Sequence, residues 1–264
     1  MASSHENLIA INGVTHAYGK DGDALPVLKN LTLGVPLHGF TAVVGPSGCG
    51  KSTLTRLIAG LMRPDEGEVW LHGERVSSPR STVGMAFQNP VLLEWRSILK
   101  NVLLPLEIVP TNLSKQEAEE RALHLLHLVG LSGFEDKRPS ELSGGMRQRA
   151  SLCRSLIHNP EVLILDEPFG ALDAFTREDL WLTMHKLRAE EPFTGVLITH
   201  DLRESIFLAD EVVVLSDRPA TVQYTVSLTH EALPSLDELY TSEALATLNE
   251  LREQIRIARN DAEV

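Results

Sequence analysis

The sequence predicts an α/β fold whose core is a mainly parallel sheet covered by helices. Three short, wholly apolar runs, at 162–165, 196–198 and 212–215, are separated by segments with helical periodicity. Such runs are typical of buried parallel strands, because helices cover both faces of a parallel sheet. Apolar strands that alternate with helices along one chain indicate an α/β architecture.

Two features before residue 80 predict further strands. Residues 31–37 alternate between apolar and other residues, and Pro36 favours a sheet edge because proline cannot donate to a central ladder. A turn at His72-Gly73 predicts a hairpin within residues 68–76. The N-terminal part of the chain is therefore expected to hold antiparallel strands.

Two helices with clear start and stop signals are expected between residues 114 and 160. Ser114 and Glu117 form a capping box, and the apolar positions that follow it at helical spacing stop at Gly130. The next helix is predicted to start near Ser143 and to end at Asn159. Because residues 88–140 interrupt the strand–helix alternation, we interpret them as a helical insert in the core.

The end of the chain predicts one more amphipathic helix. Leu245, Leu248, Leu251 and Ile255 fall on one face of it, and packing of that face on the domain is the favoured interpretation. The region after residue 216 is too short for an appended regulatory domain.

Composition excludes several classes of protein. A formal net charge of −12 argues against general nucleic-acid binding, which requires basic surface. The two cysteines, Cys49 and Cys153, form no metal-binding motif and fit a reducing compartment. Residues 1–13 lack the pattern of a signal peptide, and no apolar run is long enough to cross a membrane. Any membrane role is expected to involve a partner.

Residues 45–52, Gly-Pro-Ser-Gly-Cys-Gly-Lys-Ser, match the phosphate-binding pattern G-x-x-x-x-G-K-[ST]. A predicted strand at 40–44 precedes them and a predicted helix at 53–61 follows, which is the context that this motif requires. Glycines allow the backbone N–H groups to point at phosphate oxygens, and the helix presents its positive end to the same anion. Lys51 is expected to reach the β- and γ-phosphates, and the Ser52 hydroxyl to ligate Mg²⁺.

Asp166 and Glu167 place two carboxylates at the end of the apolar run 162–165. Asp166 suits Mg²⁺ ligation, and Glu167 suits a general base that activates water for attack on a γ-phosphate. The alternative is a solvent-exposed acidic pair after a strand.

A second glycine-rich helix start lies at residues 142–146, Leu-Ser-Gly-Gly-Met. Ser143 can cap the helix, and the glycines leave N–H groups open to an anion, although a plain helix cap is the alternative. The order of these motifs resembles the ATP-binding cassette family over residues 8 to about 216. In that family this stretch is the signature motif. Its Ser143 and Gly145 would contact the γ-phosphate of ATP held by a second copy in a head-to-tail dimer.

The resemblance implies a single domain, 1–264, with ATP and Mg²⁺ as cofactors. Its P-loop NTPase core and N-terminal antiparallel β-subdomain would occupy 8–87 and 160–216. The inserted α-helical subdomain would be 88–159, and 217–264 would be a C-terminal extension. These boundaries follow from the family pattern and from the predicted elements.

Four further residues match family positions. Tyr18 would stack on adenine, Gln88 would sense Mg²⁺ and the attacking water, Asp173 would couple the two sites, and His200 would contact the γ-phosphate. Their alternatives are a core aromatic, a loop residue, a helix cap and a strand-end histidine. The nucleotide-contacting residues expected in total are Tyr18, Gly45, Pro46, Ser47, Gly48, Cys49, Gly50, Lys51, Ser52, Thr53, Ser143, Gly144, Gly145 and Asp173. The expected catalytic residues are Glu167, His200 and Gln88, and the expected Mg²⁺ ligands are Ser52, Gln88 and Asp166.

The stretch 89–96 is unusually apolar for a surface insert and could form a groove for a short helix of a membrane subunit, with local core packing as the alternative. The spacing of Leu92, Leu93 and Trp95 before Asn101 resembles ATPase subunits of nitrate, sulfonate and taurine importers, although Glu94 replaces the usual proline. This resemblance implies transmembrane permease subunits, a solute-binding protein, and a peripheral place on the cytoplasmic face of the inner membrane. An exporter or lipoprotein-release ATPase, or a soluble non-transport cassette, remains the alternative.

Overall fold

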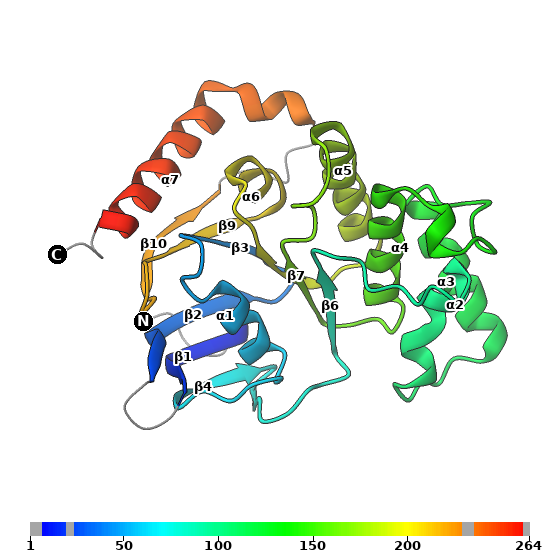
Figure 1. Ribbon diagram of the computed structural model, residues 1–264, viewed down its shortest axis with the longest axis horizontal. Helices are drawn as coiled ribbons and strands as arrows, with labels where there is room; N and C mark the ends of the chain where they lie inside the picture. Colours follow the sequence, from blue (N-terminus) through cyan, green and yellow to red (C-terminus); the bar gives the residue numbers. More distant parts are fainter. Residues whose placement is uncertain (1–6, 20–23, 229–234, 261–264) are drawn as a thin grey trace. The chain divides into compact units, whose positions relative to one another are not determined.

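The computed structural model describes residues 7–19, 24–228 and 235–260 (Figure 1). Residues 1–6, the start of the segment in which no signal peptide is expected, lie outside these ranges. The chain forms two compact units, the first from residues 1–80 and 194–264 and the second from residues 81–193. The division into core, β-subdomain and helical insert at the boundaries given above stays a prediction.

In the first unit, one sheet is antiparallel. It contains β1 (Asn7–Tyr18), β2 (Leu25–Pro36), β4 (Glu66–Leu71) and β5 (Glu74–Arg75), in the order β2-β1-β4-β5. β2 lies at the edge and ends at Pro36, as the alternating pattern predicts. Between β4 and β5, His72 and Gly73 have φ angles of 51° and 72°. Positive φ at both central residues is the conformation that a tight two-residue hairpin requires, so the predicted hairpin is confirmed.

The first unit also contains the parallel strands that carry the phosphate-binding motif. β3 (Phe40–Val44) is fully buried and pairs in parallel with β8 (Thr194–Ile198) and β9 (Glu211–Leu215). β10 (Val222–Ser227) pairs with β9 in the antiparallel direction. Helices α1 (Lys51–Ile58) and α6 (Leu202–Leu208) pack against β8 and β3 respectively. The predicted burial of these apolar strands is confirmed.

The C-terminal helix α7 (Ser242–Asn260) follows a short 3₁₀ turn, η3 (Leu236–Tyr240), and packs on α6, β9 and β10. Its buried stripe is made of Ala244, Leu248, Leu251 and Ala258. Leu245 is 46% exposed, so its predicted place on the packed face is wrong. The stripe continues from Leu248 to Ala244, one turn earlier, and Leu245 lies about 100° away around the helix.

The second unit pairs β6 (Val83–Phe87) with β7 (Val162–Asp166) in parallel. Its helices are α2 (Ile98–Leu103), α3 (Lys115–Leu128), α4 (Gly144–Leu156) and α5 (Ala174–Glu190), with 3₁₀ turns η1 (Leu104–Glu107) and η2 (Pro139–Glu141). α4 packs against β6 and the other three helices. The capping box of α3 is confirmed, because Ser114 Oγ accepts from Glu117 N and Glu117 Oε2 accepts from Ser114 N.

Antiparallel and parallel strands with covering helices give the α/β fold that the sequence predicts. None of the helices in the described ranges has the length and apolar character needed to cross a bilayer.

Candidate functional site

The glycine-rich loop between β3 and α1 has the conformation of an anion cradle. Gly48 and Gly50 have φ angles of 79° and 120°, which side chains with a Cβ rarely adopt. A Cβ on Gly50 would lie 2.7 Å from Val27 Cγ1, so β2 also requires glycine there. No side chain caps the start of α1. Because the first N–H groups of an α-helix have no partner within the helix, this helix start suits the binding of an anion.

Lys51 lies over this loop. Only 7% of the residue is exposed, and Nζ donates to the carbonyl oxygens of Gly45, at 2.9 Å, and Pro46, at 2.8 Å. The loop therefore holds the ammonium group in place. Loop and ammonium group together would bind phosphate. Cys49 is buried beside it, and burial raises the pKa of this thiol despite the nearby charge of Lys51. A thiol that is buried and protonated is unreactive. Cys49 is therefore better explained as a tolerated residue than as a reactive cysteine.

Tyr18 forms a hydrogen bond with the helix that follows the cradle. Its hydroxyl lies 3.1 Å from Thr53 Oγ1, and 38% of the residue is exposed. His16 contacts the Tyr18 ring edge-on, with centroids 5.2 Å apart, and its Nδ1 lies 3.3 Å from Asp65 Oδ2. The ring is thus fixed beside α1 with much of its surface open to solvent. This arrangement suits stacking on a base, whereas a core aromatic would be covered.

His200 lies at the same sheet edge as the cradle. β3 and β8 run in parallel, with Val43 opposite Ile198. Gly45 and His200 each lie two residues after that pair, so they lie at the same level. His200 is exposed. The residues on either side of it are fixed, because the Thr199 hydroxyl donates to Glu204 Oε2 and Asp201 caps α6.

In the second unit, the acidic pair and Gln88 meet at one sheet edge. The parallel register places Phe87 opposite Asp166, so Gln88 and Glu167 follow neighbouring strands at the same level. Glu167 has a φ angle of 49°. Such a conformation costs on the order of 1–3 kcal/mol for a residue other than glycine, and such strain is concentrated at functional sites.

The second glycine-rich segment is a capped helix start. Ser143 is exposed and its Oγ accepts from Met146 N at 3.3 Å, so the predicted cap of α4 is present. Gly145 is buried, and a Cβ there would lie 2.4 Å from Thr176 Cγ2 of α5. Close packing against α5 therefore requires glycine at this position. The two N–H groups of Gly144 and Gly145 precede the one that Ser143 occupies.

Asp173 caps α5. Its carboxylate accepts from Thr176 N at 3.0 Å and from the Thr176 hydroxyl at 2.6 Å. These two bonds, the hydroxyl first, lower the pKa of Asp173 below its ordinary value. The helix cap that sequence alone left as an alternative is therefore present, and a coupling role for Asp173 stays a prediction.

Comparison with known proteins identifies the family. The sequence model described as "ABC transporter" matches residues 28–170, more than half of the chain. The chain belongs to the ABC transporter family. It is a cassette ATPase with the phosphate cradle, acidic pair and signature segment described above.

Several curated relatives align with most of this cassette. An aliphatic sulfonates import ATP-binding protein, SsuB 2 of Agrobacterium fabrum, is 41% identical over 87% of this chain and 88% of its own. A taurine import ATP-binding protein, TauB of Yersinia pestis, is 43% identical over 77% and 79% of the two chains. An uncharacterised ABC transporter ATP-binding protein of Methanocaldococcus jannaschii is 41% identical over 83% and 82%.

A solved structure agrees with the fold. A dimeric ATP-binding cassette in a post-hydrolysis state, bound to ADP and inorganic phosphate, superimposes with a TM-score of 0.73. It is 30% identical, and the match covers 84% of this chain and 99% of that one.

The cassette contains one cation beside the cradle that sequence analysis missed. Arg218 Nη2 lies 3.9 Å from the position that a Cβ on Gly48 would take. Its guanidinium has neither a hydrogen-bond acceptor nor an ion-pair partner among the residues that the structure describes. Arg218 belongs to no motif, but it follows β9, a parallel neighbour of β3. The order of the strands in the sheet is therefore the signal that would have placed Arg218 beside the cradle.

The segment 91–96 of the cassette contains four apolar residues, together with Glu94 and Arg96, and is partly exposed. Leu92 is buried, whereas Trp95 is 73% exposed. Asn101 holds this segment, since its Oδ1 accepts from Leu93 N and its Nδ2 donates to the carbonyl oxygens of Leu93, Arg96 and Ser97. Core packing therefore accounts for Leu92, while Trp95 is presented outward.

Proposed function

We propose that this cassette is the energy-coupling ATPase subunit of a membrane importer for a small organic solute with a sulfonate group, such as an alkanesulfonate or taurine. The observation that carries this proposal is the alignment with the sulfonate and taurine import ATP-binding proteins, at 41% and 43% identity over 87% and 77% of this chain. The cytoplasmic face of the inner membrane follows as the proposed location, with permease subunits as partners and a solute-binding protein delivering the solute.

The cradle is proposed to bind the triphosphate of ATP. Open N–H groups of the loop and α1, with the Lys51 ammonium, would contact the β- and γ-phosphates, and the exposed Tyr18 ring would stack on adenine. The free guanidinium of Arg218 would add a second positive charge beside Gly48.

Magnesium is proposed to bind to Ser52, Gln88 and Asp166. These residues offer a hydroxyl, an amide oxygen and a carboxylate, all hard oxygen donors of the kind that Mg²⁺ prefers. Gln88 and Asp166 lie at the same edge of the β6–β7 pair, which supports this assignment. When bound, the ion would neutralise charge on the phosphates.

Hydrolysis is proposed to depend on Glu167. Its carboxylate would take a proton from a water molecule as the water oxygen bonds to the γ-phosphorus and the bond to the bridging oxygen of ADP breaks. Gln88 would orient that water and His200 would contact the γ-phosphate. The left-handed backbone at Glu167 supports a functional role, because the fold maintains a strained conformation there.

A second copy of the chain is proposed to complete each site. Its Ser143 and Gly145, at the start of α4, would close over the γ-phosphate bound in the first copy's cradle. The dimeric solved cassette supports this assembly. The free N–H groups before Met146 would be the donors.

The proposed partner can be tested on membranes. A tagged chain, coexpressed with the proteins of its source membrane and captured after mild solubilisation, is expected to retain an integral permease. Addition of a solute-binding protein loaded with taurine or an alkanesulfonate should raise ATP hydrolysis by that complex. Retention of a lipoprotein-release or exporter subunit, or stimulation by neither solute, would contradict the importer assignment.

Coupling is expected to pass through the exposed end of segment 91–96. Trp95→Glu should abolish transport in the assembled complex while the isolated chain keeps its basal ATPase activity, since Trp95 is 73% exposed. Leu92→Glu buries a charge and should unfold the segment, with loss of both activities. Leu123→Glu, on exposed surface of α3, serves as the matched control and should leave transport intact. Loss of folding in Trp95→Glu would instead support core packing.

A further inference from the structure

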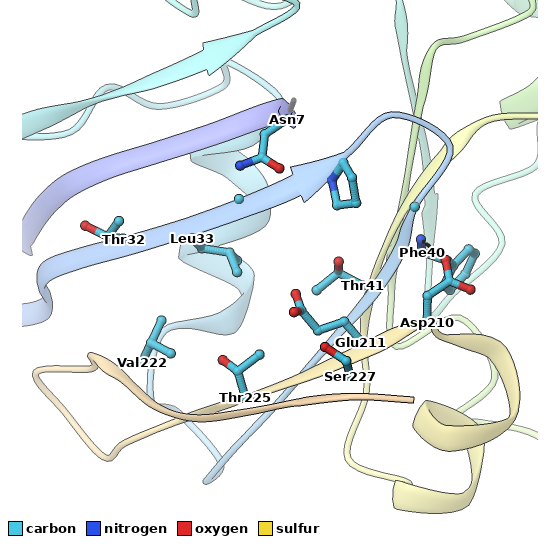
Figure 2. A pocket seen from close by; sticks show the side chains of 13 residues that line it. Asn7, Thr32, Leu33, Phe40, Thr41, Asp210, Glu211, Val222, Thr225 and Ser227 are labelled. Atoms are coloured by element: carbon cyan, nitrogen blue, oxygen red, sulfur yellow. Dashed lines mark hydrogen bonds between the residues drawn. The ribbon is translucent and has the colours of Figure 1, made fainter. Parts of the chain in front are cut away.

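A cavity lies in the first unit, at the opposite end of the strands that carry the cradle. It has a volume of about 510 Å³ and lies between β2 on one side and β3, β9 and β10 on the other (Figure 2). Thr41 and Glu211 are paired at the start of β3 and β9 and both line it, whereas Gly45 follows the end of β3. Gly45 lies four positions after Thr41 along the chain, a distance of roughly 13 Å in a strand.

The cavity contains a carboxylate that none of the described residues neutralises. Figure 2 shows the Glu211 side chain pointing into the space between Leu33, Thr41 and Thr225. Within the described ranges, Glu211 accepts no hydrogen bond at its side chain and forms no ion pair. Burial alone raises the pKa of this carboxyl group above its ordinary value.

The neighbouring carboxylate, Asp210, differs. Its Oδ2 accepts from Phe40 N at 2.7 Å, so it anchors the start of β3. Glu211 is therefore the acidic group that is free to contact a ligand. A half-buried carboxylate without a partner is unfavourable, and a bound cation would remove that penalty.

The remaining lining favours an organic cation over other ligands. It combines hydroxyl groups of Thr41, Thr225 and Ser227 with apolar Leu33 and Val222, and no Lys, Arg or His occurs among the described residues that line it. An anion would meet only negative charge, in a chain of net charge −12. A metal ion would need several oxygen ligands, and no group of three acidic, His or Cys side chains placed to hold one occurs among the described residues.

We propose that this cavity is a binding site, separate from the nucleotide cradle, for a small organic cation whose ammonium or guanidinium group pairs with Glu211. The volume is within the usual range for small-molecule pockets, about 300–1,000 Å³. The hydroxyls of Thr41 and Ser227 accept hydrogen bonds from the cation, and Leu33 and Val222 cover a short aliphatic body. This site is additional to the proposed importer function and does not depend on it.

The test uses n-butylamine and butylguanidine as probes with the full chain, and n-butanol as the neutral control. Calorimetric titration should show saturable binding of at least one cation and none of butanol. Glu211→Gln, which keeps the side-chain shape, should weaken binding at least tenfold. Glu119→Gln, an exposed carboxylate on α3, removes the same charge and should leave binding unchanged.

A cavity-filling variant and a competition with ATP test the proposal further. Thr225→Trp should fill the cavity and block binding while Glu211 remains, and saturating ATP should not displace the amine. Circular dichroism of each variant checks that it is folded. Equal binding to wild type and Glu211→Gln, equal losses in both glutamine variants, displacement by ATP, or no saturable binding of either cation would overturn the proposal.

Discussion

The cradle at residues 45–52 and the signature segment at 142–146 are both glycine-rich helix starts, but they use glycine differently. In the cradle, Gly48 and Gly50 have left-handed backbone angles, and no side chain caps α1. In the signature segment, Ser143 caps α4, and Gly145 is required because Thr176 packs directly against it.

This difference indicates two kinds of anion site. The cradle would turn its own backbone around an anion and add a buried lysine, so we expect it to bind phosphate within one chain. The signature segment has one N–H already occupied by Ser143 and only a helix end to offer. It is therefore suited to complete a site whose anion is already bound elsewhere.

The largest expected effect comes from separating binding in the cradle from hydrolysis. Glu167→Gln removes the proposed base and keeps the side-chain volume, so kcat for ATP should fall roughly 100- to 10,000-fold while ATP affinity stays near wild type. Steady-state phosphate release and equilibrium binding of a fluorescent ATP analogue measure the two quantities. Glu190→Gln, at the exposed end of α5, is the matched control and should keep full activity. An equal fall in both quantities would contradict the assignment.

A smaller effect distinguishes the two glycine roles. Gly145→Ala places a methyl group 2.4 Å from Thr176 Cγ2, and such overpacking should cost about 1–3 kcal/mol of unfolding free energy. Thr176→Ser removes that methyl group and retains the hydroxyl that donates to Asp173, so it should restore stability in the double variant. Urea denaturation measures each variant.

Gly48→Ala provides the comparison, because its nearest neighbour would be 3.9 Å away and only the backbone angle is unfavourable. Its cost should be about 1 kcal/mol and should be the same with or without Thr176→Ser. Rescue of Gly48→Ala by Thr176→Ser, or no rescue of Gly145→Ala, would show that the glycines are not used in these different ways.

The smallest expected effect concerns two of the helix caps in the second unit, Asp173 at α5 and Ser143 at α4. Hydrogen bonds lower the pKa of Asp173 in the folded state below its ordinary value of 3.8, so its contribution to stability is present above pH 3.8 and is lost as pH falls through the folded pKa. The difference in melting temperature between wild type and Asp173→Asn should therefore shrink in acid. Ser143→Ala removes a neutral cap, and its effect should not change with pH. Parallel pH profiles for the two variants would contradict this account.

Local chemistry made much of this predictable. The cradle follows from a glycine pattern between an apolar strand and a helix, and the α3 cap follows from Ser114 and Glu117. Residues that act through the tertiary fold were not predictable in the same way. The contact of Gly145 with Thr176, the position of Arg218 beside Gly48 and the carboxylate of Glu211 in its cavity all join residues distant in sequence. The helical pattern wrongly predicts Leu245 on the buried face, because the small residue Ala244 occupies that place in the buried stripe.

The central claim is that the signature segment of one copy closes over ATP held in the cradle of another, and mixing two defective chains tests it most directly. Both chains carry Glu167→Gln to slow turnover. One also carries Lys51→Ala, which disables its cradle, and the other carries Ser143→Arg, which blocks its signature segment.

Each chain alone should remain monomeric with ATP and Mg²⁺, measured by size-exclusion chromatography with light scattering. The mixture contains one intact cradle facing one intact signature segment, so a dimer should appear that requires both chains and ATP. No dimer in the mixture, when the Glu167→Gln chain without further changes does dimerise, would contradict the claim, as would dimers formed by either defective chain alone.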